Sequence, residues 1–213
     1  MLVGAGLTMI VPADDHPHAT RPRWHAWIGR FIARLLGWDF VEPFPTDKKM
    51  VVLSGPHTSN WDFLFMSCAA LIYRAEIRAM AKASAFRFPM GPLVRSIGAL
   101  PIDRSGAHGV VDQMVQLFNS SERLLLVIPA SGTRSKRPYW RSGFYWVAHQ
   151  AQVPLALSYL DYENKRAGIL CTLRTTGDIH ADMERIRQAY AHIRGKYPEN
   201  RSEIRLKEED AEP

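Results

Sequence analysis

Short apolar runs alternate with helical patterns along most of this chain. The clearest run covers residues 123–129, where the sequence RLLLVIP is that of a strand buried on both faces. Further strands are predicted at residues 50–53, 77–80, 99–102, 153–160 and 168–175, and helices at residues 61–74, 109–119, 142–152 and 179–194. This alternation predicts an α/β fold with a mostly parallel central sheet flanked by helices on both faces.

A basic segment rich in aromatic residues precedes these elements at residues 22–38. Its large apolar residues recur at three- and four-residue spacing: Trp24, Trp27, Ile28, Phe31, Leu35 and Trp38. Arg30 and Arg34 are four residues apart and fall together on the same helix. The pattern predicts a basic amphipathic helix of the kind that lies at a membrane surface. A helix packed on the core, with its arginines merely solvated, is the alternative, and both can hold.

The length of 213 residues suits one domain spanning residues 1–213. Neither a repeat nor a low-complexity linker divides it. Residues 1–21 are expected to be flexible or membrane-dipping, and residues 196–213 to form a polar, frayed tail. No apolar stretch reaches the ~20 residues that a membrane-spanning helix needs, and the N-terminus does not have the features of a signal peptide.

The formal net charge of +6 is compatible with nucleic acid, anionic lipid or a phosphorylated small molecule as the partner. Few basic residues interleave with aromatic residues along a strand, as RNA-binding sheets require, so no nucleic-acid partner is expected. Cys68 and Cys171 lie in apolar runs without metal-ligand spacing. We therefore expect two buried thiols, a reducing cytosol and no metal site.

Polar, turn-rich segments follow four of the predicted strands. Their sequences are GPHTSNWD, PIDRSG, PASGTRSK and LDYENKR. Ligand sites of α/β sheets collect at the carboxyl ends of the strands, where functional loops begin. The sequence therefore predicts a site built from these four segments.

The first segment contains His57 and Asp62. On one continuous helix they would lie about 140° apart, so they can meet only if His57 is in the turn before the helix and Asp62 in its first turn. Asn60 is expected to cap that helix. Asp62 would then hold one ring nitrogen and leave the other as a base, and the helix N-terminus would offer N–H groups to an oxyanion. A loop histidine beside a capping aspartate is the simpler interpretation of the pair taken alone.

Two further segments carry positive charge. Arg104 follows a predicted strand and can clamp a phosphate, and Lys82, after the preceding strand, can add a second cation. Ser131, Gly132, Thr133 and Arg134 form a turn that suits anion binding through backbone amides, although it has no P-loop pattern. A surface arginine paired with Asp103 and a plain β-turn are the alternatives.

Taken in order, these segments resemble the glycerolipid acyltransferase family, whose best-known members are the lysophosphatidate acyltransferases. HTSNWD resembles the family's block of His, four residues and Asp, and GALPIDR the block with the phosphate-binding Arg. IPASGTRS resembles the Pro-Glu-Gly-Thr-Arg block, and VPLALSYLDY the block with Val-Pro or Ile-Pro. The resemblance covers about residues 38–173, most of the chain.

The resemblance implies an O-acyltransferase with the family's glycerol-phosphate-acyltransferase-like α/β layers. It would move a fatty acyl group from acyl-CoA or acyl-carrier protein to a hydroxyl of a (lyso)phospholipid or glycolipid-like acceptor, with no further cofactor. His57 would be the general base and Asp62 its orienting partner. Arg104, Arg134 and Lys82 would hold the acceptor phosphate, which Gly132 lets the backbone approach. The resemblance and the basic helix imply a cytoplasmic protein, peripheral to the inner face of the membrane.

One position departs from the family pattern. Ser131 stands where the third block normally has Glu, and Ser is shorter and uncharged. Three interpretations follow: the acceptor differs from an ordinary lysophospholipid, the activity is weak, or Ser131 is an introduced change. A catalytically impaired or thioesterase-like lipid-binding member of the same family is therefore the alternative function.

Overall fold

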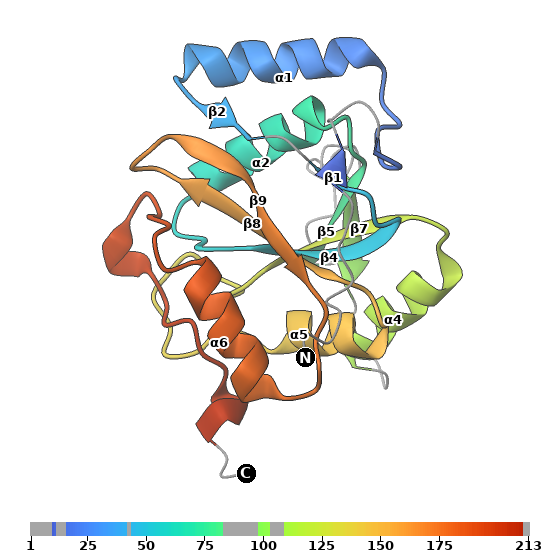
Figure 1. Cartoon of the computed structure of the whole chain (residues 1–213), viewed down its shortest axis with the longest axis vertical. Helices are drawn as coiled ribbons and strands as arrows, with labels where there is room; N and C mark the ends of the chain where they lie inside the picture. The colour runs from blue at the N-terminus through green and yellow to red at the C-terminus, as the bar shows by residue number, and fades with distance from the viewer. Residues whose placement is uncertain (1–9, 12–15, 42–43, 83–97, 103–108, 211–213) are drawn as a thin grey trace, which may run out of the picture.

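The computed structural model describes residues 10–11, 16–41, 44–82, 98–102 and 109–210 (Figure 1). The strands are β1 (Ile10–Val11), β2 (Asp39–Phe40), β3 (Phe44–Pro45), β4 (Lys49–Ser54), β5 (Ile77–Lys82), β6 (Ala99–Ile102), β7 (Leu124–Pro129), β8 (Leu155–Asp161) and β9 (Arg166–Leu173). The α-helices are α1 (Arg23–Leu35), α2 (Trp61–Ile72), α4 (Val110–Ser120), α5 (Gly143–Gln150) and α6 (Ile179–Ala189), and two short 3₁₀ helices follow, η2 (Pro198–Asn200) and η3 (Lys207–Asp210).

Seven of the described strands form the central sheet in the order β2-β9-β8-β4-β7-β5-β6. Within it β8 and β9 are antiparallel, and the other described neighbours run parallel. The predicted α/β fold with a mostly parallel sheet is confirmed. The short strands β1 and β3 pair separately and antiparallel.

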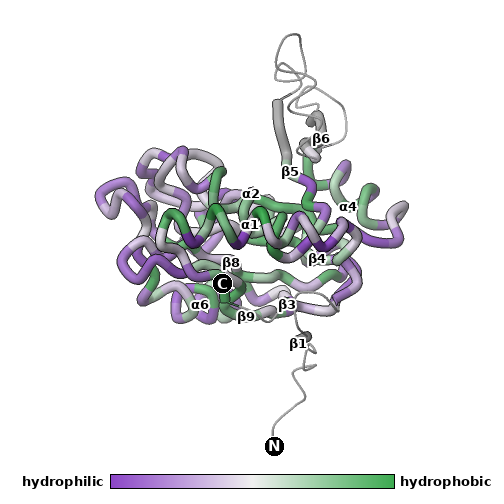
Figure 2. The backbone as a smooth tube through the Cα atoms, turned by 90° about the horizontal axis from the view of Figure 1, so that it is seen from above, coloured by the Kyte–Doolittle hydropathy of each residue, from purple (hydrophilic) through white to green (hydrophobic). Residues whose placement is uncertain are grey.

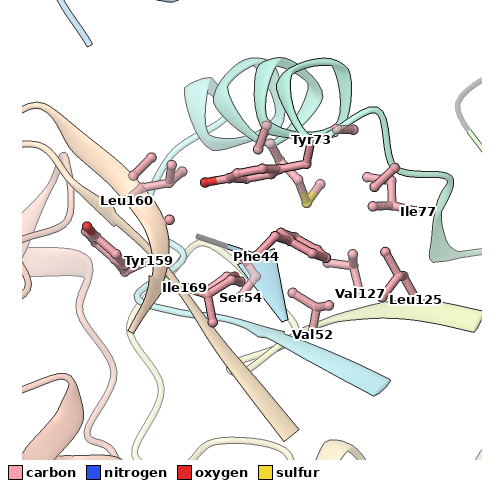
Figure 3. A pocket seen from close by; sticks show the side chains of 17 residues that line it. Phe44, Val52, Ser54, Tyr73, Ile77, Leu125, Val127, Tyr159, Leu160 and Ile169 are labelled. Carbon is pink, nitrogen blue, oxygen red and sulfur yellow. The ribbon is translucent and has the colours of Figure 1, made fainter. Parts of the chain in front are cut away.

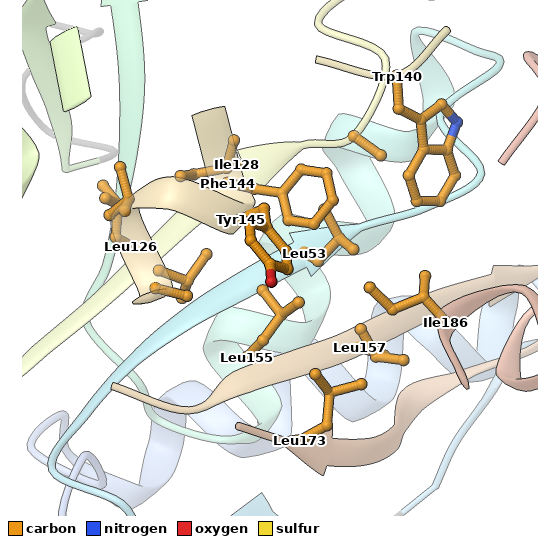
Figure 4. Close-up of a cluster of buried hydrophobic side chains, with 14 of the residues drawn as sticks. Leu53, Leu126, Ile128, Trp140, Phe144, Tyr145, Leu155, Leu157, Leu173 and Ile186 are labelled. Carbon is orange, nitrogen blue, oxygen red and sulfur yellow. The ribbon is translucent and has the colours of Figure 1, made fainter. Parts of the chain in front are cut away.

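The central strands send alternate side chains to two apolar layers, which explains their continuous apolar sequence. Met50 and Val52 of β4 face the layer that contains α1 and α2, whereas Val51 and Leu53 face the layer that contains α4, α5 and α6 (Figures 1 and 4). Figure 4 shows side chains of β4, β7 and β8 meeting those of α5 and α6 in the second layer. Each fully buried Leu or Ile contributes about 1.5–3 kcal/mol, so both layers hold the sheet in place.

Helix α1 packs on α2 with its small residues and turns its large ones outward. Ala26, Gly29 and Ala33 are buried, and a Cβ at Gly29 would lie 2.9 Å from Ile72 Cγ1. The large residues are instead exposed: Trp24, Trp27, Ile28, Phe31 and Leu35. Seen from above, α1 lies over α2, and parts of the α1 tube have the colour of hydrophobic residues (Figure 2). The helix therefore does pack on the body of the protein, but its aromatic face does not.

Trp38 departs from the predicted helix pattern. It lies beyond the end of α1 and is buried, with its ring stacked on Phe65 at a centroid distance of 4.0 Å. It therefore belongs to the core beside α2 rather than to the exposed face of α1.

Residues 16–21 are packed rather than flexible or membrane-dipping. His16 and His18 are buried, and their Nε2 atoms lie 2.7 Å from the Tyr73 carbonyl and 2.8 Å from the Asp47 carbonyl. A histidine ring can donate a hydrogen bond to a buried backbone carbonyl. Hydrophobic periodicity does not reveal such a bond, so the sequence pattern did not predict this packing.

The prediction of a frayed C-terminal tail is wrong for residues 196–210. Leu206 is fully buried, Ser202 Oγ accepts a hydrogen bond from the Arg137 N–H at 3.0 Å, and the Trp140 N–H donates to the Arg205 carbonyl at 2.8 Å. The polar composition of the tail thus serves hydrogen bonds to the loop that follows β7.

The two cysteines have different surroundings. Cys68 is buried as predicted, but Cys171, which lies on β9, is exposed. Among the helices in the described ranges, none is long and apolar enough to cross a bilayer.

Candidate active site

The centre of the sheet contains a topological switch point. Strands β4 and β7 are parallel neighbours, with Ser54 paired to Pro129 at their carboxyl ends. The chain leaves β4 toward α2 on one face and leaves β7 toward α5 on the other face. Ligands of such sheets usually bind outside the carboxyl ends of the strands, at a switch point of this kind. His57 lies in the first loop and Ser131–Arg134 in the second.

His57 and Asp62 meet as their spacing required. His57 lies in the turn before α2, Asp62 is the second residue of that helix, and His57 Nδ1 is 2.8 Å from Asp62 Oδ2. The imidazole is 18% exposed and the carboxylate 3% exposed. His57 Nε2 forms no hydrogen bond with another residue in the described ranges. The ring therefore has one nitrogen on a buried carboxylate and one available to a substrate proton.

Asp62 receives donors on both oxygens. Oδ2 accepts the N–H groups of Thr58 at 3.0 Å and Ser59 at 3.1 Å, and Oδ1 accepts the Tyr162 hydroxyl at 2.7 Å. Burial acts to raise the pKa of Asp62, but the donors, first among them His57 and Tyr162, outweigh it and hold the pKa below its ordinary value. The carboxylate is therefore charged and fixed in orientation.

Tyr162 is a site residue that the sequence interpretation missed. It follows β8 by one residue, and its hydroxyl reaches Asp62 across 100 residues of chain. Burial and the neighbouring Asp62 carboxylate raise the pKa of Tyr162 well above its usual range, so the hydroxyl remains a donor. Its position at the end of a predicted strand, in LDYENKR, was the only available signal.

The start of α2 differs in two respects from the prediction. Asn60 occupies the cap position, but its side chain accepts no capping hydrogen bond. Ser59 Oγ instead accepts the Trp61 N–H at 3.1 Å. The N–H groups of Thr58, Ser59 and Trp61 are thus used within the turn and are not free for an oxyanion.

The loop after β7 is a tight turn with exposed cations. Gly132 has φ +66°, which favours glycine, and its N–H donates to the Pro129 carbonyl at 3.1 Å. Ser131 is buried and its hydroxyl donates to the Thr133 carbonyl at 2.5 Å, so it is directed into its own loop. Arg134 is exposed and forms no ion pair with any described residue. The turn therefore presents a guanidinium at the same sheet edge as His57.

The two remaining predicted cations are only partly described. The backbone of Lys82 ends β5, the strand beside β7, and pairs with Ile102 of β6. Arg104 lies outside the described residues. The topology thus brings the backbone of Lys82 to the carboxyl edge of the sheet, near the loops that contain His57 and Arg134.

An apolar cavity lies between α2 and the sheet (Figure 3). Its walls include Ser54 and Val127 from the sheet, Met66 from α2 and Tyr73 directly after that helix. Its volume is about 70 Å³, and apolar side chains make up most of its lining. No group of three potential metal ligands occurs within the described ranges.

The fold and the site define an α/β protein in which a histidine and a buried carboxylate meet at a switch point of the sheet. The acyltransferase family model matches residues 39–156, more than half of the chain, and the chain therefore belongs to that family. The match contains His57, Asp62 and the loop after β7.

A solved structure is similar to this one. It is the 1-acyl-sn-glycerophosphate (LPA) acyltransferase PlsC from Thermotoga maritima, with a TM-score of 0.54 and 14% sequence identity. The similarity covers 79% of this chain and 78% of the other. At this identity it establishes the shared fold alone. No curated protein matches the chain by sequence.

Proposed function

We propose that the protein is an O-acyltransferase that moves a fatty acyl group from acyl-CoA or acyl-carrier protein to a hydroxyl of a (lyso)phospholipid or glycolipid-like acceptor. The observation that carries the proposal is the 2.8 Å pair of His57 and Asp62 at the switch point of the sheet. Family membership supports acyl transfer as the reaction class.

In the proposed reaction, His57 Nε2 takes the proton of the acceptor hydroxyl as its oxygen attacks the thioester carbonyl carbon. The tetrahedral intermediate collapses, the carbon–sulfur bond breaks, and the protonated imidazole returns its proton to the departing sulfur. Asp62 holds the ring and stabilises its positive charge, so no acyl-enzyme is needed.

The acceptor phosphate is proposed to bind Arg134, with Lys82 and Arg104 as further cations. Arg134 supports this assignment because it is exposed, forms no ion pair with a described residue and lies two residues after the left-handed Gly132. A guanidinium binds a phosphate through two parallel hydrogen bonds, which orients the acceptor as well as attracting it. Thr133 and Ser131 complete the proposed substrate loop.

Purified protein, a labelled acyl thioester and a panel of lysophospholipid and glycolipid acceptors test the function. We expect acylated lipid and free thiol in equal amounts, with acyl-CoA and acyl-carrier protein compared as donors. Free fatty acid as the sole labelled product, or no turnover with any acceptor, would favour the alternative of a thioesterase-like or impaired lipid binder.

The alternative rests on Ser131, whose hydroxyl bonds to its own loop and offers no charge to a substrate. If the protein is an active transferase with its own acceptor, Ser131→Glu is expected to leave transfer to that acceptor within a fewfold of the original, or lower it, because the new carboxylate repels a phosphate. Steady-state rates with each acceptor measure this. A large gain in transfer would identify an impaired member that lacks the acidic residue.

Helix α1 supports a peripheral association with the inner, cytoplasmic face of a membrane. It exposes Trp24 by 58%, Trp27 by 75% and Phe31 by 64%, and it contains no acidic residue. Exposed aromatic rings flanked by arginines favour the interface of an anionic bilayer, since apolar insertion and charge attraction add there. A lipid acceptor would be reached at the same surface.

Replacement of both Trp24 and Trp27 by alanine is expected to weaken binding to vesicles of mixed phosphatidylglycerol and phosphatidylcholine by about tenfold or more, because two inserting rings are lost. Co-sedimentation measures the binding. Lys136→Ala/Arg137→Ala removes two exposed charges elsewhere and is the control. Unchanged binding in the tryptophan variant, together with weaker binding in the charge variant, would mean that net charge alone attracts the protein to lipid.

A further inference from the structure

We propose that Tyr162 and residues 194–197 form a brace that holds His57 and Asp62 in their reactive arrangement. Tyr162 acts in it as a positioning residue. The inference rests on the proposed function of this pair. Both parts of the brace lie beyond residue 156, where the family match ends.

Tyr162 fixes the side of Asp62 that His57 does not use. Its hydroxyl donates to Oδ1 at 2.7 Å, while His57 Nδ1 approaches Oδ2. The Tyr162 ring is held edge-on by Trp38 and Phe65, at centroid distances of 4.9 Å and 5.7 Å. A rigid donor on one oxygen prevents the carboxylate from rotating away from the imidazole.

The segment 194–197 touches both supports of Asp62. The Tyr162 N–H donates to the Arg194 carbonyl at 2.9 Å, and the Tyr197 N–H donates to Thr58 Oγ1 at 3.3 Å. Thr58 in turn donates its own N–H to Asp62. The Lys196 ammonium lies 4.6 Å from the centroid of the Trp61 ring, which adds a cation–π contact with the first residue of α2. One short segment therefore joins Tyr162 to the turn that contains His57.

Gly195 makes this contact possible. It is buried, and a Cβ there would lie 2.6 Å from Thr58 Oγ1 and 3.0 Å from Thr58 Cγ2. The segment itself is anchored by Arg201, whose guanidinium donates to the carbonyls of Ile193 and Tyr190 at 3.0 Å. The polar C-terminal tail is thus ordered by a series of hydrogen bonds that leads to the carboxylate of Asp62.

Tyr162→Phe tests the first half of the brace. We expect kcat to fall about tenfold or more with little change in KM. The variant loses the hydrogen bond to Oδ1 of the buried Asp62 carboxylate, an atom that takes no direct part in the reaction. The acid limb of the pH–rate profile should move to higher pH, since Tyr162 helps to lower the pKa of Asp62. The titratable groups near this carboxylate are His57, Tyr162, Tyr197 and Lys196.

Tyr145→Phe is the matched control. The Tyr145 hydroxyl donates to the buried carboxylate of Asp182 at 3.0 Å, away from the switch point. This variant should lose stability without a change in kcat or in the pH–rate profile. If Tyr162→Phe loses only stability, as Tyr145→Phe does, the positioning role is refuted.

Gly195→Ala tests the second half. The added methyl group should push Thr58 out of place and lower kcat by about tenfold or more. Thr58→Ala removes both clashing atoms, so Gly195→Ala/Thr58→Ala should regain the activity of Thr58→Ala alone. Thermal melting of each variant separates misfolding from misplacement. Wild-type kcat in Gly195→Ala, or a double variant no better than Gly195→Ala, would overturn this half.

The two proposals fail in different ways. If His57→Ala retains acyl transfer, the proposed function itself fails. If His57→Ala is inactive while Tyr162→Phe and Gly195→Ala both have normal kcat, the function stands and the brace alone is refuted.

Discussion

His57→Ala is expected to lower kcat for acyl transfer by about 10²–10⁴-fold, the usual contribution of a general base. Without the ring, the acceptor hydroxyl loses its proposed base at the atom that attacks. The free energy of unfolding should change little, because His57 is 18% exposed and bonds only to Asp62 among the described residues. Initial rates with saturating donor and acceptor, together with a thermal melt, measure both effects.

His180→Ala is the control for this prediction, since His180 is exposed on α6 and forms no hydrogen bond or ion pair with His57 or Asp62. It should transfer acyl groups at the wild-type rate. Equal rates in His57→Ala and wild-type protein would rule out imidazole base catalysis and, with it, the proposed function.

Asp62→Asn is expected to lower kcat by a similar 10²–10⁴-fold and the free energy of unfolding by about 1–3 kcal/mol. The amide NH₂ would face N–H or O–H donors of Thr58, Ser59 and Tyr162, so at least one buried donor would lose its acceptor. The ring of His57 would also lose the negative charge that stabilises its protonated form. Denaturant titration and steady-state kinetics measure the two losses separately.

The stability loss should depend on pH. The folded-state pKa of Asp62 lies below its ordinary value, so the charged carboxylate contributes stability at neutral pH that is lost as the pH falls through the folded pKa. The difference in the free energy of unfolding between wild type and Asp62→Asn should therefore shrink in acid.

Asp182→Asn is the control, because Asp182 is also buried and also accepts a tyrosine hydroxyl. It should destabilise the protein without a comparable loss of kcat; an equal loss would make the effect of Asp62 purely structural.

The sequence predicted the fold class, and it allowed the meeting of His57 with Asp62, which the family resemblance then favoured. Both depend on local patterns: apolar runs that alternate with helices, and a turn that ends directly before α2. The placement of the loop after β7 at the same edge also follows, because parallel strands end on the same side of a sheet.

The remaining features depend on contacts between distant parts of the chain. Tyr162 reaches Asp62 across 100 residues, and no pattern near Tyr162 indicates this bond. The tail looked unstructured because its polar residues have no periodicity, although they bond to backbone groups far away. The orientation of α1 could not be predicted either. An amphipathic sequence pattern shows that a helix has an apolar side, but not whether that side meets the protein core or a lipid.

The attachment of α1 through Ala26, Gly29 and Ala33 has a consequence for how the protein would sit on a bilayer. Small side chains let the axes of α1 and α2 approach closely, and α2 begins with the residues next to His57. Immersion of the outer rings of α1 in the headgroups would therefore fix the height of the reactive imidazole above the lipid. The hydroxyl of an acceptor anchored by its own acyl chain would then arrive from one side and at one depth.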